Sequence, residues 1–504
     1  MLAPVAAQDQ RSLDLALRTQ DATDAFSVDV ATLLRPTDEV GQSGDSNTKT
    51  VVRLTRRSLG HPPSDLRLEA SSSMVLGALV EDFIIDTRST WWPWREANQF
   101  STIADGLVGR AQVAALAACV GTVRNNAALA KQSEIANSDA LHRVNKYMTK
   151  GYAGPFAIGL ILVAKGLAAF DLTRICFGPG SKQDQTSVPA WEAHYLGIGA
   201  LMQHASPSIF ARGLGAEVLI NSIPRLMWFA LRDRRSFFMN QPEWQHVLRN
   251  HLQSSRRTPF RATIWPIAVQ VPSLLERIDA IGERICSQRS KAVRLKHLQG
   301  CQILLTDVKT LSKKLDAWLA EYTTVASHPT SQGYYRRVQN ACIDNSADKL
   351  FTQIQFTSLE AAEVHMLYWS YKLILATAET KICDIVVRAW LTTDLETHWS
   401  ANGTRYAVLI CQARDYWIES CAVSIDSAET CWSLPLRLAA QWFAMSSAHI
   451  PELEYCLAAY EATKDGHMIG VVTETTLDQA YCSIPRLLEE VKSRLRVNER
   501  HSSQ

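Results

Sequence analysis

Hydrophobic residues recur along most of the chain at the spacing of an α-helix. The clearest case is the range 291–322, where apolar side chains follow one another every three, four or seven residues: Leu295, Leu298, Leu305, Val308, Leu311, Leu315, Trp318 and Tyr322. This spacing places them all on one face of a helix. We therefore expect a helix that packs by this face inside a helical domain, with a coiled coil as the alternative.

The same periodicity predicts further helices on both sides. Those before this helix cover 106–125, 139–147, 156–170, 188–203 and 217–235, the last broken or kinked at Pro224. Those after it cover 358–387, 406–421, 434–446, 451–462 and 476–495. Strand-like alternation is scarce, and residues 471–475 are the best strand candidate. The prediction is an all-α fold, with one large multi-helix domain.

The first part of the chain has a different pattern. Its first fifty residues hold eight acidic and four basic side chains, and only short apolar groups interrupt the polar sequence. Such a segment cannot bury enough apolar surface to fold by itself. We expect residues 1–68 to form a mostly disordered leader, and residues 69–498 to form the helical domain. The basic cluster Arg53, Arg56 and Arg57 is then a solvated linker or, alternatively, a nuclear targeting signal.

Composition excludes several classes of protein. The 504 residues include 52 Lys and Arg against 50 Asp and Glu, so a function based on global charge is excluded. The longest apolar run, residues 153–164, is too short to cross a membrane, which needs about 20 residues. The 11 cysteines contain no C-x-x-C pair, and reduced thiols in an intracellular protein are the expectation.

Motifs of enzyme and nucleotide sites are missing from the sequence. It contains no G-x-S-x-G, no H-E-x-x-H and no P-loop. The histidines are dispersed, without the spacing of a metal site. We therefore assign no catalytic residues, no cofactor and no metal. We interpret the sequon at residues 402–404 as a chance turn.

Two segments are locally basic. The range 225–261 holds eight arginines against Asp233 and Glu243, and the range 284–314 holds eight basic residues against Asp307. Such segments can contact nucleic acid phosphates or an acidic partner. Because the whole chain nets only +2, solvated helix faces balanced by acids elsewhere are the preferred interpretation.

A resemblance to a known family starts at residue 191. The stretch reads AWEAHYLGIGALMQHASPSIFARGLG, and it leads through a long helix with arginines to the ending FFMNQPEWQ. It resembles the large helical domain of fungal zinc-cluster transcription factors. A later match, LPLRLA at residues 434–439, is similar to the family's late helices. The residues that carry the resemblance are Trp191, His194, Gly197, Leu201, Pro242, Glu243, Trp244, Pro435 and Leu436.

The motif residues have a structural interpretation. We expect Pro242 and Trp244 to end a helix and to anchor its loop in the core. Pro435 is expected to open a helix. The chain departs from the family in one respect, because its first cysteine is Cys119 and the six-cysteine zinc module is therefore missing.

The resemblance implies a regulator of fungal, and specifically secondary-metabolite, gene expression in the nucleus. Its partner would be another transcription factor or a co-regulator, with DNA reached only indirectly and no membrane involved. A homo- or heterodimer and a small-molecule effector are both compatible with such a domain. The alternatives are a helical enzyme or a ligand-binding protein of a biosynthetic pathway, located in the cytoplasm.

Overall fold

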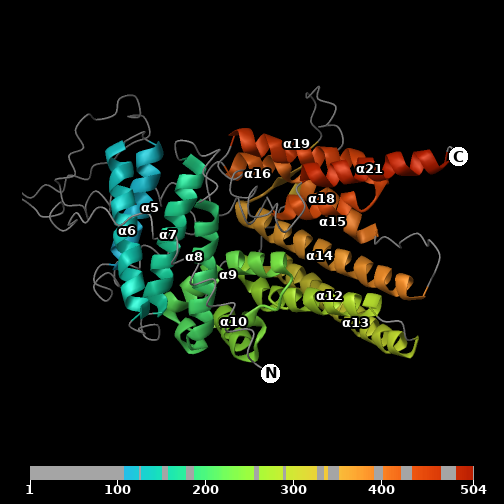
Figure 1. Cartoon of the computed structure of the whole chain (residues 1–504), viewed down its shortest axis with the longest axis horizontal. Coiled ribbons are helices and arrows are strands. Elements are labelled where there is room, and N and C mark those ends of the chain that lie inside the picture. Colours follow the sequence, from blue (N-terminus) through green and yellow to red (C-terminus); the bar gives the residue numbers. More distant parts are fainter. Residues whose placement is uncertain are drawn as a thin grey trace, which may run out of the picture. The chain divides into compact units, whose positions relative to one another are not determined.

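The fold is known from a computed structural model of the whole chain. The residues that it describes are 107–123, 127–149, 157–177, 187–254, 260–287, 291–325, 334–338, 351–390, 401–421, 434–466 and 484–502. About 90% of this part is helical, which confirms the all-α class (Figure 1). The expected leader and the strand candidate at 471–475 lie outside the described residues.

The chain divides after Ala205 into two compact units. This boundary lies inside the range 69–498, which the sequence analysis treats as one domain. None of the described helices is long and apolar enough to cross a bilayer.

The first unit contains four described helices. They are α5 (Leu107–Val123), α6 (Ala127–Thr149), α7 (Ala157–Phe177) and α8 (Ser187–His204). Helix α5 packs on α6 and α7, and α7 packs on α8. The apolar run that starts at residue 153 contributes to α7, where Ile161, Leu162 and Val163 are fully buried.

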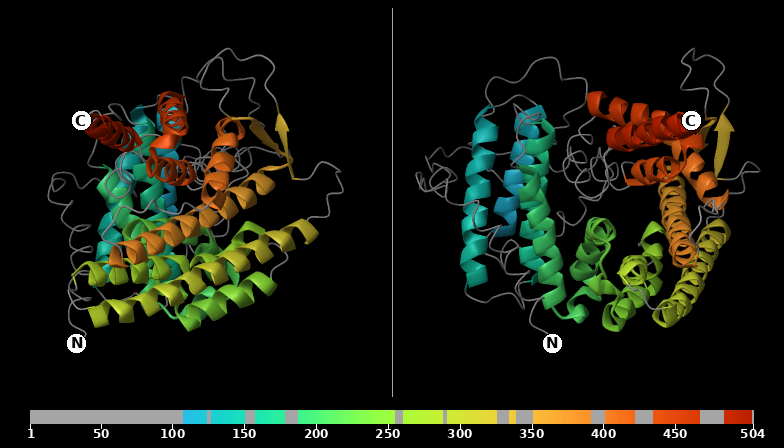
Figure 2. Two further views of the ribbon diagram at one scale, coloured as in Figure 1. Left: turned by 90° about the vertical axis from the view of Figure 1, so that its right-hand side faces the viewer. Right: turned by 45° about the vertical axis from the view of Figure 1, so that its right-hand side comes forward.

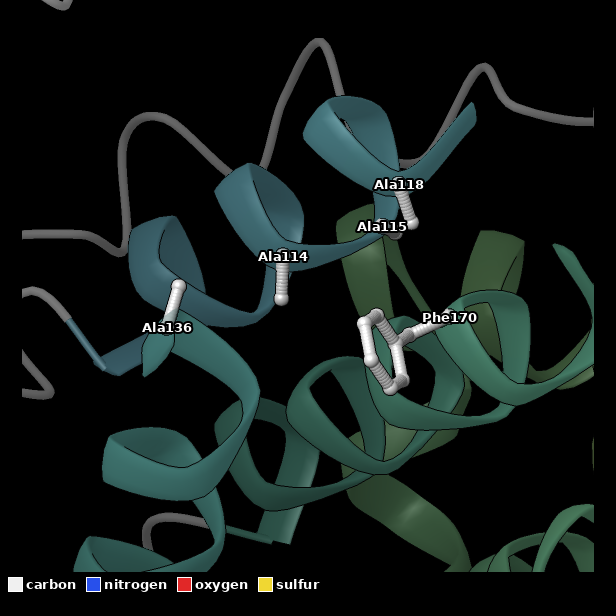
Figure 3. Close-up of a cluster of buried hydrophobic side chains, with 5 residues drawn as sticks. All are labelled: Ala114, Ala115, Ala118, Ala136 and Phe170. Atoms are coloured by element: carbon white, nitrogen blue, oxygen red, sulfur yellow. The ribbon is translucent and has the colours of Figure 1, made fainter. Parts of the chain in front are cut away.

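Small side chains hold α5 against its neighbours. Ala114, Ala115 and Ala118 of α5 are buried next to Ala136 of α6 and the ring of Phe170 of α7 (Figure 3). Alanine has no side chain beyond Cβ, so these helices approach closely. An ion pair between Arg110 and Asp139 also joins α5 to α6.

The second unit begins with short helical segments and continues into long helices. Its first elements are η2 (Pro207–Phe210), α9 (Gly213–Asp233), η3 (Phe238–Asn240), α10 (Pro242–Ser254), η4 (Phe260–Ile264) and α11 (Trp265–Ala268). Three long helices follow, α12 (Val271–Ser287), α13 (Lys291–Val325) and α14 (Leu359–Trp390). Both α12 and α14 pack on α13 (Figure 1).

Gly300 lies where α13 packs on α12. A Cβ atom at this position of α13 would lie 2.9 Å from Cδ1 of Ile281 on α12. The glycine, a weak point by helix propensity, therefore permits the packing of α12 on α13. Pro224 lies within α9, which stays one helix through it.

The remaining helices complete the second unit. They are α15 (Ala401–Gln412), α16 (Arg414–Cys421), α18 (Leu434–Ala444), η7 (Ser447–His449), α19 (Ile450–Gly466) and α21 (Ile484–Ser502). Helix α18 contacts α14, α15, α19 and α21, and is therefore the centre of this part. The sequon lies in the first turn of α15, where Thr404 accepts a hydrogen bond from Trp442, so it forms helix and not the expected turn.

A small antiparallel sheet was missed by the sequence analysis. Strand β1 (Tyr335–Val338) pairs with β2 (Gln353–Phe356), with Tyr335 opposite Phe356 and Arg337 opposite Ile354. Figure 2 shows the two strands side by side at the margin of the second unit. Strand β2 packs against α14, α15 and α16.

Candidate functional site

Four residues of the family resemblance lie on α8 in the first unit. Trp191 is almost fully buried and meets the ring of Tyr195 edge-on at 5.2 Å. His194 places Nε2 3.1 Å from Oδ2 of Asp171 on α7, so it links two helices. Gly197 leaves open space where a Cβ would stand, and Leu201 is half-buried. These positions pack and connect helices.

Pro242, Glu243 and Trp244 form the beginning of α10 and not the end of a helix, so that expectation is wrong. Proline is well placed in a first helical turn because the N–H that it lacks would have no helical partner there. Trp244 is buried, as expected, between Phe210 at 5.4 Å and Phe238 at 5.1 Å.

Pro435 and Leu436 lie in the first turn of α18, as the sequence predicts for Pro435. Both are buried. The nine residues of the resemblance thus occupy three helices, α8 of the first unit and α10 and α18 of the second.

Three of the eight arginines in the basic stretch 225–261, namely Arg232, Arg234 and Arg261, form ion pairs within the protein, and Arg256 and Arg257 lie outside the described residues. Arg232 pairs with Asp233 and lies over the rings of Trp228 and Phe229. Arg234, in a left-handed conformation at φ 50°, ends α9 and binds Asp279 of α12.

A third cation joins this network. Lys381 of α14 also binds Asp279. Burial raises the pKa of Asp279, but Arg234 and Lys381 outweigh this effect and the pKa is lowered. The network joins three helices, which favours the interpretation that these charges are structural.

A group of aromatic side chains surrounds His365 on α14, and the sequence analysis did not single it out. His365 is 5% exposed. Five aromatic rings lie with their centroids within 6.2 Å of the imidazole: Tyr322, Tyr334, Tyr335, Phe356 and Trp369. We call these six residues the His365 cluster. It draws on α13, β1, β2 and α14, which are distant in sequence.

The environment of His365 selects its protonation state. Nδ1 lies 2.8 Å from the carbonyl oxygen of Ala361, so Nδ1 carries the hydrogen and donates it. Burial lowers the pKa of His365, and the bond to Ala361 opposes this only in part. The imidazole is therefore neutral at pH 7, and Nε2 carries a lone pair among the rings.

Two acidic residues lie on the same helix, two and five positions before His365. Glu363 is 4% exposed and binds Arg261 of η4, while Glu360 accepts the backbone N–H of Phe260. Burial raises the pKa of Glu363, and Arg261 counteracts it. Burial and the neighbouring Glu360 raise the pKa of Tyr322 to about 12. This phenol therefore stays protonated and can only donate or accept hydrogen bonds.

A second polar group links α13, α14 and α15. Lys372 is nearly buried, and its Nζ lies 2.9 Å from Oδ1 of Asp316. Tyr368 donates to the same carboxylate oxygen at 2.6 Å. Lys372 also lies 5.8 Å from the ring centroids of Tyr368 and Tyr406, within the range of a cation–π contact. Burial and its bonded neighbours raise the pKa of Tyr368.

Two thiols meet in the core of the second unit. Cys411 of α15 and Cys456 of α19 are fully buried, with their Sγ atoms 3.6 Å apart. Burial raises the pKa of Cys456, which disfavours the reactive thiolate. The described residues contain no group of three or more side chains able to hold a metal ion.

Comparison of the chain with known protein families, curated proteins and solved structures gives no match. The His365 cluster is therefore identified by geometry alone. One sequence signal could have pointed to it, because His365 and Trp369 are four residues apart and share a helix face. Nothing in the sequence, however, brings residues 334 and 335 to that face.

Proposed function

We propose that this chain is a transcription regulator that acts through contacts with protein partners. The observation that carries the proposal is the resemblance to the helical domain of fungal zinc-cluster transcription factors, and above all its stretch 237–244. This stretch folds as one aromatic group, in which the ring of Phe238 meets those of Phe237 and Trp244 edge to face around η3. The motif residues thus stabilise the fold. This supports a domain that acts by binding partners through its surface.

The proposed site of action is the nucleus, where the chain would reach DNA through another transcription factor or a co-regulator. The test is a transcript profile after deletion of the gene, compared with the same strain complemented by the intact gene. We expect a coherent set of transcripts, within a biosynthetic pathway, to change and to be restored. An unchanged profile contradicts the proposal.

A helical enzyme or ligand-binding protein is the second candidate. The observation that favours it is the neutral imidazole of His365, which offers an Nε2 lone pair among aromatic rings. Under this alternative, deletion leaves transcripts unchanged while one metabolite accumulates or disappears. That metabolite should raise the melting temperature of the intact protein by binding the folded state. The increase should be smaller for the His365→Asn variant.

A further inference from the structure

One edge of the small sheet offers backbone hydrogen-bonding groups. In an antiparallel pair, opposite residues alternate between pairs that exchange hydrogen bonds and pairs that do not. Thr357 donates its N–H to the carbonyl of Tyr334 at 3.1 Å, so this opposed pair is a hydrogen-bonded one. By this register, the pairs Tyr335–Phe356 and Arg337–Ile354 are of the kind that exchanges no hydrogen bonds. Their backbone N–H and C=O groups face outward.

The N–H and C=O groups of Tyr335 and Arg337 therefore point away from β2. Among the described elements, β1 has β2 as its one strand neighbour, whereas β2 is covered by α14, α15 and α16. The outward N–H and C=O groups of these two residues, which are two positions apart, can form backbone hydrogen bonds with an additional strand.

The side chains along this edge are positive. Arg336 and Arg337 are both exposed. The guanidinium of Arg336 donates to Gln355, a neutral partner, at 2.9 Å from Nη2. Among the described residues, neither arginine forms an ion pair with a carboxylate, in contrast to Arg234 and Arg261 of the same unit.

We propose that β1 is a docking edge for an extended acidic segment of a partner protein, which adds to the sheet as a third strand. The segment's backbone would bond to the N–H and C=O of Tyr335 and Arg337. Because Arg336 and Arg337 point to opposite faces of the sheet, carboxylates on both faces of the new strand would pair with them. The inference deepens the proposed function, on which it rests, by naming the surface and the chemistry of the partner.

The length and the charge of β1 restrict which strands can pair with its free edge. It is four residues long, and its two arginines repel basic or copy-to-copy pairing. Selection is then by charge, because only an acidic strand gains ion pairs as well as backbone hydrogen bonds.

The test measures the binding of a labelled nine-residue peptide of glutamate and valine, using fluorescence anisotropy and the full chain. Its glutamates stand in adjacent pairs, so that carboxylates lie on both faces of the added strand. A peptide with lysine in place of glutamate is its control. We expect the glutamate peptide to bind, the lysine peptide not to bind, and the affinity to fall as salt rises. A glutamate peptide that does not bind, or a lysine peptide that binds as well, overturns the proposal.

Two variants separate charge from backbone. Arg337→Ala removes one charge and keeps the N–H, so the affinity should fall about threefold to tenfold. Arg337→Pro also removes the outward N–H, which β2 does not use, and its ring obstructs the edge. A further loss of at least about tenfold is expected. Equal affinity of the two variants contradicts strand addition.

A change in the peptide guards against misfolding of Arg337→Pro. N-methylation of alternate peptide backbone nitrogens, on the side that would face β1, should abolish binding to the unaltered protein. Methylation in the opposite register should be tolerated. Equal binding of both peptides contradicts the proposal. Because this assay uses no gene expression, it can fail while the transcript profile still responds to deletion, and the reverse also holds.

Discussion

One cluster of the first unit packs its helices through alanines, whereas the His365 cluster of the second unit packs its elements through aromatic rings. Around Ala114, Ala115 and Ala118 the contacts consist of methyl groups, with one phenyl ring from Phe170. Around His365 the contacts consist of five rings that belong to four elements. The first arrangement depends on closeness of backbones, and the second on the volume and shape of large side chains.

This difference predicts opposite sensitivities. A site made of small residues tolerates no added volume, because neighbouring backbones cannot move apart without loss of contact elsewhere. A site made of rings tolerates no removed volume, because a rigid surround leaves a cavity. The experiments below test this contrast, starting with the largest expected effect.

Trp369→Ala should be the most damaging change. Trp369 is 2% exposed and meets His365, Tyr335 and Phe356 within 5.9 Å between ring centroids. Removal of the indole should cost about 3–5 kcal/mol in the free energy of unfolding. Hydrogen exchange of α14 peptides would measure the loss, with Trp369→Phe as a control that retains a ring. An alanine variant as protected as the phenylalanine variant would contradict the role of the cluster.

Ala118→Leu should have the next largest effect, for the opposite reason. Ala118 is 3% exposed within the cluster of Figure 3, and the added carbons have no space. Overpacking should cost about 1–3 kcal/mol. Exchange of α5 and α6 peptides is the measurement, and Ala127→Leu on the exposed face of α6 is the matched control. A larger effect at Ala127 than at Ala118 would refute the contrast.

The pH dependence of stability should report the burial of His365. Its pKa is lowered in the folded state, so the unfolded chain binds the proton first as the pH falls. Stability should therefore decrease below the ordinary histidine pKa of about 6.5, by at most about 1.4 kcal/mol per pH unit from this residue. Denaturation midpoints between pH 5 and 8 measure it. His365→Asn, which keeps a donor for Ala361, should show a flatter profile; an unchanged slope would exclude His365 as its source.

An exposed ion pair should matter least. Lys492 of α21 lies 3.0 Å from Glu454 of α19, and both side chains are at least one-third exposed. Lys492→Ala should change stability by less than about 1 kcal/mol, and the difference should shrink in high salt. Chemical denaturation at two salt concentrations is the measurement. A loss as large as that of Ala118→Leu would show that charge, and not packing, dominates this part.

The sequence predicts a helix well where an apolar face repeats along it, and poorly where that repeat is weak. Helix α13 is expected over 291–322 and is found over Lys291–Val325, because eight apolar residues repeat on one face. Helix α6 begins twelve residues earlier than the predicted 139–147, since its first turn is an Ala-Ala-Leu-Ala run and the mostly polar residues that follow repeat no clear apolar face. The division of α15 from α16 at Ala413 carries no glycine or proline to announce it.

The sites depend on tertiary contacts that periodicity does not contain. Strand β1 is Tyr-Arg-Arg-Val, which has no alternation, and it forms because β2 and α14 provide a surface for Tyr335. The pairing of Arg261 with Glu363 spans 102 residues of sequence and could not be foreseen. Trp244 was foreseen correctly as a buried anchor, because a large aromatic ring in a helical pattern is usually core.

The buried pair Cys411 and Cys456 can serve as a labelling probe for local unfolding of the core. Cys411 and Cys456 are inaccessible while α15 and α19 stay together, whereas Cys383 is partly exposed. An alkylating reagent added to the native protein should modify Cys383 early, and the peptides that contain 411 and 456 only when these helices separate. The rate at which the two thiols become labelled reports how often the core opens. Whether they are labelled together or one after the other reports whether α15 and α19 separate from the core as one unit.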